Sequence, residues 1–107
     1  MSDRVALIAK MRLRAEIRDE AASWLNTAKV RSRSEPGCLT YNIHIDANEP
    51  VMLIFYEIWE DKAAFRLHLE GDVFAEFMHG KERYVQGEIE ITNLEELNNE
   101  NTKGACR

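Results

Sequence analysis

The sequence predicts an α+β fold whose elements follow the order β-α-β-β-α-β. Apolar and polar residues alternate over residues 4–14 and 38–46, which is typical of strands with two different faces. Residues 15–33 carry apolar side chains at helical spacing, and a nearly continuous apolar run at 51–59 precedes a second helical pattern. The 107 residues fit one domain, and 45% hydrophobic residues suffice for a core.

The first strand and helix are marked by a change of period. One face of the strand at 4–14 is apolar throughout: Val5, Leu7, Ala9, Met11 and Leu13. The helix at 15–33 carries one apolar stripe: Ile17, Ala21, Trp24, Leu25 and Ala28. Pro36 disfavours helix at Glu35, and Gly37 permits a turn, so the helix ends before this Glu-Pro-Gly segment.

Two strands follow the turn. In the strand at 38–46 one face is expected to hold Leu39, Tyr41, Ile43 and Ile45. The other face holds Thr40, Asn42 and His44. Residues 47–50 form a turn, and so short a connection makes the strand at 51–59 antiparallel to its predecessor. Because residues 51–59 are apolar at nearly every position, both faces of that strand are apolar, and we expect both to be covered.

The second half predicts a helix, a turn-rich piece and a last strand. Asp61 caps a helix that ends at Gly71, with one side formed by Ala64, Phe65, His68 and Leu69. Asp72 can cap a second piece that contains Phe74, Phe77 and Met78, and Gly80 allows another break. Residues 84–92 form the final strand. The folded domain is expected to span residues 1–97, and residues 98–107 form a polar, mobile tail.

This order is that of the ferredoxin-like fold, an antiparallel four-stranded sheet with both helices on one face. The opposite sheet face is left bare, although the strand at 51–59 is apolar on that side too. An open apolar face of that size favours a partner, and a two-fold axis is the commonest way to bury it. We therefore expect a homodimer.

Composition excludes several classes of protein. A net charge of −5 argues against nucleic-acid binding, and the one basic cluster, Lys29, Arg31 and Arg33, complements a helix C-terminus. No run approaches the roughly 20 apolar residues of a membrane helix, and the charged N-terminal stretch is unlike a signal peptide. Cys38 and Cys106 are far apart in the sequence, so we expect no structural disulfide between them. Free cysteines fit a protein of the reducing cytoplasm. His44, His68 and His79 show no metal-ligand spacing, so neither metal nor cofactor is expected.

Three segments together resemble the antibiotic biosynthesis monooxygenase family. They are Glu35-Pro36-Gly37-Cys38-Leu39 with Tyr41, then Tyr56-Glu57 with Trp59 and Asp61, and then His68. The resemblance covers most of residues 4–92 and implies a dimeric α/β barrel. It also implies cofactor-independent oxygenation of quinols or polycyclic phenols, or isomerisation of small phosphorylated signals, in a pocket between the sheet and the helices. Many relatives have a second histidine five residues after the first; here that residue is Val73, so a mechanism with two imidazoles is not expected.

His68 is the candidate catalytic residue. Oxygenation without a cofactor needs a base that makes the substrate electron-rich, donors for the oxyanion, and a dry pocket. Histidine suits the role of base because its unperturbed pKa is near 6.5. The alternative is a structural histidine that bonds a backbone carbonyl.

The candidate substrate-binding residues are Trp59, Glu57, Tyr41, Asn42, Phe65 and Phe74. Trp59 stacks on a flat substrate or fills the core. Glu57 stands in an apolar strand, where we expect it to pair with a cation such as Arg66 or Arg12 rather than to serve a pocket. Tyr41 and Asn42 point to opposite faces of one strand, so at most one of them meets the helices. The phenylalanines wall a pocket or belong to a plain core.

The leading prediction is a monooxygenase that uses O2 and a small quinol or phenol. One alternative is a non-catalytic ligand-binding or stress-response dimer. Another is a haem-degrading relative, because Phe65, Gly71-Asp72 and Val73-Phe74 resemble a segment of those enzymes. That group, however, implies other residues at Met11 and His68, and a haem-ligating histidine at Met78, one residue before His79.

Overall fold

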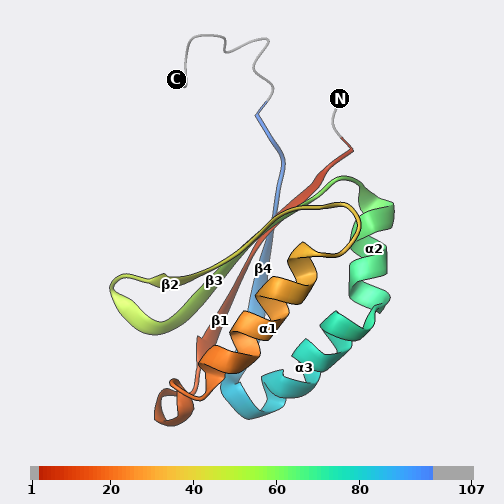
Figure 1. Ribbon diagram of the computed structural model, residues 1–107. Coiled ribbons are helices and arrows are strands. Elements are labelled where there is room, and N and C mark those ends of the chain that lie inside the picture. The colour runs from red at the N-terminus through yellow and green to blue at the C-terminus, as the bar shows by residue number, and fades with distance from the viewer. Residues whose placement is uncertain (1–2, 98–107) are drawn as a thin grey trace.

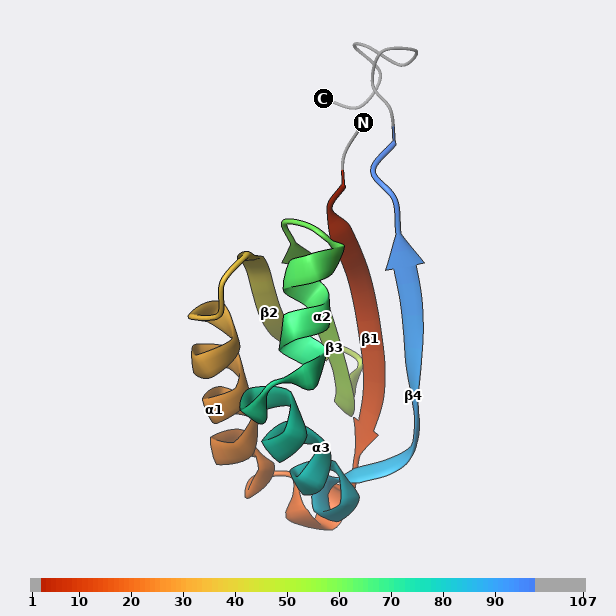
Figure 2. The ribbon, with the colours of Figure 1, turned by 90° about the vertical axis from the view of Figure 1, so that its right-hand side faces the viewer.

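The computed structural model describes residues 3–97 and confirms the predicted order of elements. Four antiparallel strands pair in the order β2-β3-β1-β4, and the helices all lie on one face of the sheet (Figures 1 and 2). The strands are β1 (Val5–Leu13), β2 (Cys38–Asp46), β3 (Glu49–Trp59) and β4 (Val85–Leu94). The helices are the short 3-10 turn η1 (Ala15–Ile17), α1 (Ala21–Arg33), α2 (Lys62–Glu70) and α3 (Asp72–Tyr84).

The start of the first helix was predicted too early. Only a 3-10 turn follows β1, and α1 begins at the fully buried Ala21. The chain leaves β1 through a tethered corner: the backbone N–H of Arg14 donates to the Tyr84 carbonyl, and the Arg18 guanidinium donates to the Pro50 carbonyl. These bonds hold Arg14 and Arg18 in the corner between the strand and the helix, so the regular helix begins only at Ala21.

The break that the sequence allows at Gly80 does not occur, because α3 runs through it to Tyr84. Gly80 lies under the Trp24 indole of α1, and a Cβ atom there would collide with the indole nitrogen. The same nitrogen donates to the Phe77 carbonyl one turn earlier. This glycine therefore permits close packing of α1 on α3. The helix is capped at Gly71, and Asp72 makes no side-chain cap.

Helix α2 begins as the sequence predicts. The Asp61 carboxylate accepts a hydrogen bond of 2.8 Å from the Ala64 N–H, which satisfies one of the free donors of the first turn. The buried residues of this helix are Ala64 and His68. The cap therefore fixes where along the sheet His68 meets β3.

Strand register decides which side chains face the helices. Tyr41 of β2 lies opposite Glu57 of β3, and both are buried on the helix-covered face. A bulge between Cys38 and Thr40 leaves Leu39 without a place in the alternation. Leu39 is accordingly 48% exposed and does not share the buried face of Tyr41, contrary to the prediction.

The sheet face away from the helices is apolar at its centre. Register places Ile8 opposite Tyr56, Lys10 opposite Ile54 and Ala6 opposite Ile58. The apolar side chains of this outer face are only partly buried by the chain itself. The helix-facing side of β3 is buried as the sequence predicts, but residues 3–97 cover its other side only in part.

Candidate functional site

A cavity of about 180 Å³ lies between the sheet and helices α2 and α3. The sheet contributes Leu7, Ala9, Met11, Tyr41, Phe55, Glu57, Ile89 and Ile91. The helices contribute Phe65, His68, Leu69, Phe74, Phe77 and Met78. Only Tyr41, Glu57 and His68 among these carry side-chain oxygen or nitrogen atoms. One lining residue, Ile91, is 57% exposed, because it lies on β4, the edge strand of the sheet, which the helices do not cover (Figure 2).

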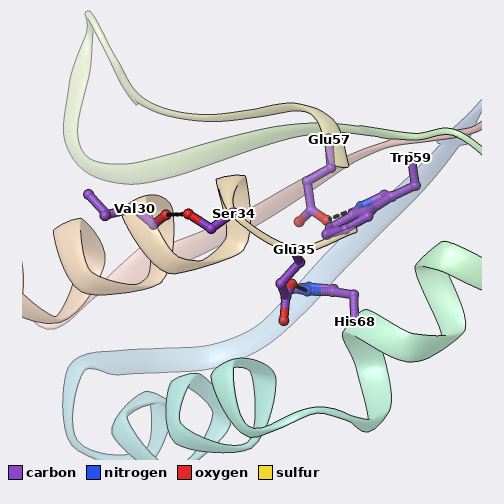
Figure 3. Close-up of polar contacts among 6 residues, drawn as sticks. All are labelled: Val30, Ser34, Glu35, Glu57, Trp59 and His68. Atoms are coloured by element: carbon purple, nitrogen blue, oxygen red, sulfur yellow. Dashed lines mark hydrogen bonds and ion pairs between the residues drawn. The ribbon is translucent and has the colours of Figure 1, made fainter. Parts of the chain in front are cut away.

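The imidazole of His68 is held on several sides. Its Nδ1 lies 2.6 Å from Oε1 of Glu35, which comes from the turn between α1 and β2 (Figure 3). The ring stacks on the Trp59 indole with centroids 4.4 Å apart, and Phe74 lies 5.5 Å away. His68 is only 4% exposed, yet it lines the cavity. Nδ1 is thus engaged, and Nε2 has no hydrogen-bond partner within residues 3–97.

Glu57 is bonded to an indole and not to a cation. Its Oε1 accepts a 3.0 Å hydrogen bond from Nε1 of Trp59, two residues along the same strand face (Figure 3). Within the described part of the chain Glu57 forms no ion pair, and Arg12 pairs with Glu49 instead. The predicted pairing with Arg12 or Arg66 was therefore wrong, because both cations lie on exposed or half-exposed surface while Glu57 faces the helices.

Burial raises the pKa of Glu57 above its ordinary value, because a charged carboxylate loses its hydration there. The Trp59 N–H bond and the nearby His68 oppose this rise in pKa, and the charge of Glu35 adds to it. The protonated form of Glu57 is therefore favoured more than in water. In that form the carboxyl group can accept from Trp59 and still donate a proton to a bound oxygen atom.

Tyr41 is the third polar group of the cavity. Burial raises the pKa of its phenol, and the Glu57 charge raises it further, so the hydroxyl remains a hydrogen-bond donor. The Ser32 hydroxyl of α1 lies near enough to oppose this rise but does not reach hydrogen-bonding geometry. Among the fully buried side-chain polar atoms of residues 3–97, Ser32 Oγ alone has no partner.

The structure brings together most of the predicted site residues. Tyr41, Glu57 and His68 line the cavity together with Phe65 and Phe74. The other two predicted residues lie elsewhere.

Trp59 is fully buried behind His68 and Glu57 and does not line the cavity, which agrees with its alternative reading as a core residue. Asn42 lies on the outer sheet face, where its Oδ1 accepts from Arg33. It therefore takes no part in this cavity, contrary to the prediction.

Sequence reasoning placed Glu35 at the end of a helix and in a family-like segment, but it did not include Glu35 among the candidate site residues. Its partner His68 is 33 residues away, and no local pattern predicts that contact. The available signal was its place in the Glu-Pro-Gly turn, because this turn packs on α2. Gly37 has a positive φ of 81°, and a Cβ atom there would collide with Ala64. Gly37 therefore keeps the turn, and Glu35 with it, close to the helix of His68.

No group of three or more His, Cys, Asp or Glu side chains in residues 3–97 is arranged to hold a metal ion. His79 is exposed on α3 and does not line the cavity, and Val73 lies outside it. Nor does any helix in this part of the chain combine the length and apolarity needed to cross a membrane.

Known proteins share this fold and sequence pattern. A solved structure of PA3566 from Pseudomonas aeruginosa is 30% identical; the match covers 92% of this chain and 98% of that one, with a TM-score of 0.82. The structure of Rv0793 from Mycobacterium tuberculosis is 21% identical over 89% of this chain and 96% of its own, with a TM-score of 0.81, and shows the fold alone.

A curated relative, the uncharacterised protein sll1783 of Synechocystis, is 29% identical over 76 residues. That match covers 71% of this chain, which spans about half, 52%, of the relative's length. The family model for antibiotic biosynthesis monooxygenase matches residues 4–80, a segment that contains Glu35, Glu57, Trp59 and His68. The chain therefore belongs to the antibiotic biosynthesis monooxygenase family.

Proposed function

We propose that the protein is a cofactor-independent monooxygenase that acts on a small quinol or phenol. The observation that carries this proposal is an apolar cavity whose polar groups are a buried imidazole, a buried carboxyl group and a phenol. Such a site can remove a proton from a flat aromatic alcohol and can stabilise the resulting oxyanion away from water. Membership of the antibiotic biosynthesis monooxygenase family supports the same reaction class.

The size of the cavity supports a small substrate. An apolar protein cavity of about 150 Å³ is known to hold one benzene ring. The present cavity of about 180 Å³ is therefore suited to one aromatic ring, with further substituents directed to the mouth near Leu69, Met78 and Ile91. The phenylalanine side chains would contact the ring face.

In the proposed reaction His68 is the base. Its Nε2 lone pair takes the proton of a substrate hydroxyl, and the bonding electrons stay on oxygen as a phenolate. Glu57 in its protonated form, and Tyr41, donate hydrogen bonds to the substrate oxygens. The electron-rich substrate then reduces O2: one oxygen atom forms a new C–O bond, and the other leaves as water with two protons. A hydroquinone is thereby oxidised by four electrons to a hydroxyquinone.

We also propose that the protein works as a homodimer, with the outer sheet faces packed together. The apolar strip formed by Ile8, Ile54, Tyr56 and Ile58 lies on adjacent strands and is only partly covered. Packing two such strips about a two-fold axis would bury both. The cavity lies on the opposite face of the sheet, so it would remain accessible in that dimer.

The reaction is tested by oxygen uptake with a panel of one-ring and two-ring hydroquinones, followed by mass spectrometry with ¹⁸O2. The proposal predicts one mole of O2 consumed per mole of substrate and one labelled oxygen atom in the product. Release of hydrogen peroxide without label in the product would instead indicate an oxidase. Binding of the hydroquinones without any turnover would indicate a non-catalytic ligand-binding protein.

A further inference from the structure

The contact between Glu35 and His68 has the geometry of an oriented base. The Oε1···Nδ1 distance of 2.6 Å is short, as expected when at least one partner is charged. An ionised carboxylate can only accept hydrogen bonds, so the proton of this contact belongs to Nδ1. The neutral ring then carries its lone pair on Nε2, which is the nitrogen that a base needs in the cavity.

The aromatic side chains around His68 restrict the orientation of its imidazole ring. Trp59 stacks against it at an interplanar angle of 30°, and the rings of Tyr41 and Phe65 lie 6.0 and 6.3 Å away. The imidazole is 3% exposed, whereas the Glu35 side chain is 19% exposed. The carboxylate thus keeps some contact with water while its partner is enclosed, which lowers the cost of holding a charge there.

Glu35 is held by its backbone, independently of its side chain. Its N–H donates to the Ser32 carbonyl at 3.0 Å, and its own carbonyl accepts from the Cys38 N–H at 3.2 Å. Next to it, the Gly37 carbonyl accepts from the Glu60 N–H at 2.8 Å. The turn therefore needs no contribution from the carboxylate, which is free to serve His68.

We propose that Glu35 is a positioning residue that keeps the proton of His68 on Nδ1 and so presents Nε2 to the substrate. This inference rests on the proposed role of His68 as the base. When Nε2 takes the substrate proton, the imidazolium that forms keeps its Nδ1–H bond to Glu35. The carboxylate stays ionised and stabilises that positive charge. A purely structural bond between the turn and α2 would fix the same tautomer, but its loss would leave kcat unchanged in a folded protein.

The first test needs no substrate. Imidazole ¹⁵N–¹H correlation spectra, assigned with His68→Gln, show which ring nitrogen carries the proton when the ring is neutral. We expect Nδ1–H in the wild type and a shift towards Nε2–H in Glu35→Ala. A wild-type ring protonated on Nε2, or an unchanged tautomer in Glu35→Ala, would overturn the proposal even if the protein were an active monooxygenase.

The second test separates positioning from folding. We expect Glu35→Ala to lower kcat at least ~10-fold while KM changes less than ~3-fold, because the base and not the cavity is affected. Glu35→Gln keeps an acceptor for Nδ1–H without the charge, so its kcat should fall between the two. Glu70→Gln, which removes an exposed carboxylate from the same helix as His68, is the matched control and should behave as the wild type.

Full kcat in a folded Glu35→Ala would contradict the positioning role and leave the proposed function intact. Absence of turnover in the wild type would contradict the proposed function, while the tautomer spectra would still decide whether Glu35 orients the ring.

Discussion

The Trp59 indole supports two functional groups at once: its ring stacks on His68 at 4.4 Å, and its N–H donates to Glu57 at 3.0 Å. Trp59 is fully buried and has no contact with the cavity itself. It is thus the shared support of the proposed base and the proposed acid. Its two contacts can be separated by substitution.

We predict that Trp59→Phe destabilises the protein by about 1–3 kcal/mol, because the buried Glu57 carboxyl group loses its hydrogen-bond donor. The Trp59 bond lowers the pKa of Glu57, so its loss penalises the ionised carboxylate most. The loss of unfolding free energy should therefore be larger at high pH than at low pH, where Glu57 is protonated in both proteins. Urea denaturation at several pH values measures this.

The control for that substitution is Trp24→Phe, in which the lost donor had served a backbone carbonyl and not a titratable group. Its effect on stability should not depend on pH through Glu57. Equal pH dependence of the two variants would contradict the role assigned to the indole N–H of Trp59.

Glu57 itself should leave a signature in the pH dependence of stability. Burial raises its pKa above the ordinary value of 4.5, so the folded protein binds more protons than the unfolded chain at pH values just above 4.5. The free energy of unfolding contributed by this group therefore falls as pH rises through that window. In Glu57→Gln, which keeps an acceptor for Trp59, this fall should be absent.

The measurement is denaturant unfolding of wild type and Glu57→Gln from pH ~4 to ~8. Glu88→Gln, an exposed carboxylate of β4, controls for the change of net charge. Parallel curves for wild type and Glu57→Gln would show that Glu57 titrates alike in the folded and unfolded states.

Two glycines with the same backbone conformation should differ in their tolerance of a methyl group. Gly37 and Gly87 have φ values of 81° and 78°, but only Gly37 has a neighbour, Ala64, in the space of a Cβ atom. Gly87→Ala should cost about 1–2 kcal/mol for the left-handed backbone. Gly37→Ala should cost a further ~1–3 kcal/mol for overpacking against α2.

Thermal and urea unfolding of both variants test that difference. Because Gly37 keeps the turn of Glu35 close to α2, Gly37→Ala should also disturb the Glu35–His68 contact, which the imidazole spectra report. Equal costs at the two glycines would mean that the turn can move away from the helix without penalty.

The proposed dimer predicts a specific weak point. A lysine in place of Tyr56, which pairs with Ile8 at the centre of the outer face, would have to be buried unpaired at the interface. We expect Tyr56→Lys to weaken dimerisation at least ~100-fold, equivalent to about 3 kcal/mol. Leu67→Lys, at a 61% exposed position on α2, should leave the dimer intact.

Light scattering at micromolar concentration, with and without the substitution, is the measurement. A wild type that is monomeric there would contradict the proposal that the outer sheet faces pack together.

The sequence predicted those features that depend on neighbouring residues. Alternation in residues 4–14 and 38–46 placed two strands correctly, and Asp61 marked the start of α2 because an N-cap bonds within its own turn. The same locality explains the failures. Gly80 was read as a possible helix break. Its actual role is to leave room for the Trp24 indole, which comes from another helix and so leaves no local pattern in the sequence.

For the site, spacing placed His68 and Phe65 on one side of α2, and the family resemblance singled out His68 as well. Alternation did not decide whether Tyr41 or Asn42 faces the cavity. It could not find Glu35, whose side chain joins two elements 33 residues apart. Sequence reasoning also assigned Glu57 the wrong partner. The structure places Glu57 beside the Trp59 indole on the helix-covered face of β3, whereas the predicted arginines lie on exposed or half-exposed surface.

The central claim, that His68 is the base of an oxygenation reaction, is tested most directly by the initial rate of hydroquinone-dependent O2 consumption. His68→Ala should lower this rate at least ~10-fold, the lower end of what a general base contributes. His79→Ala, which removes an exposed imidazole outside the cavity, should leave it unchanged. An unchanged rate in a folded His68→Ala protein would contradict the account.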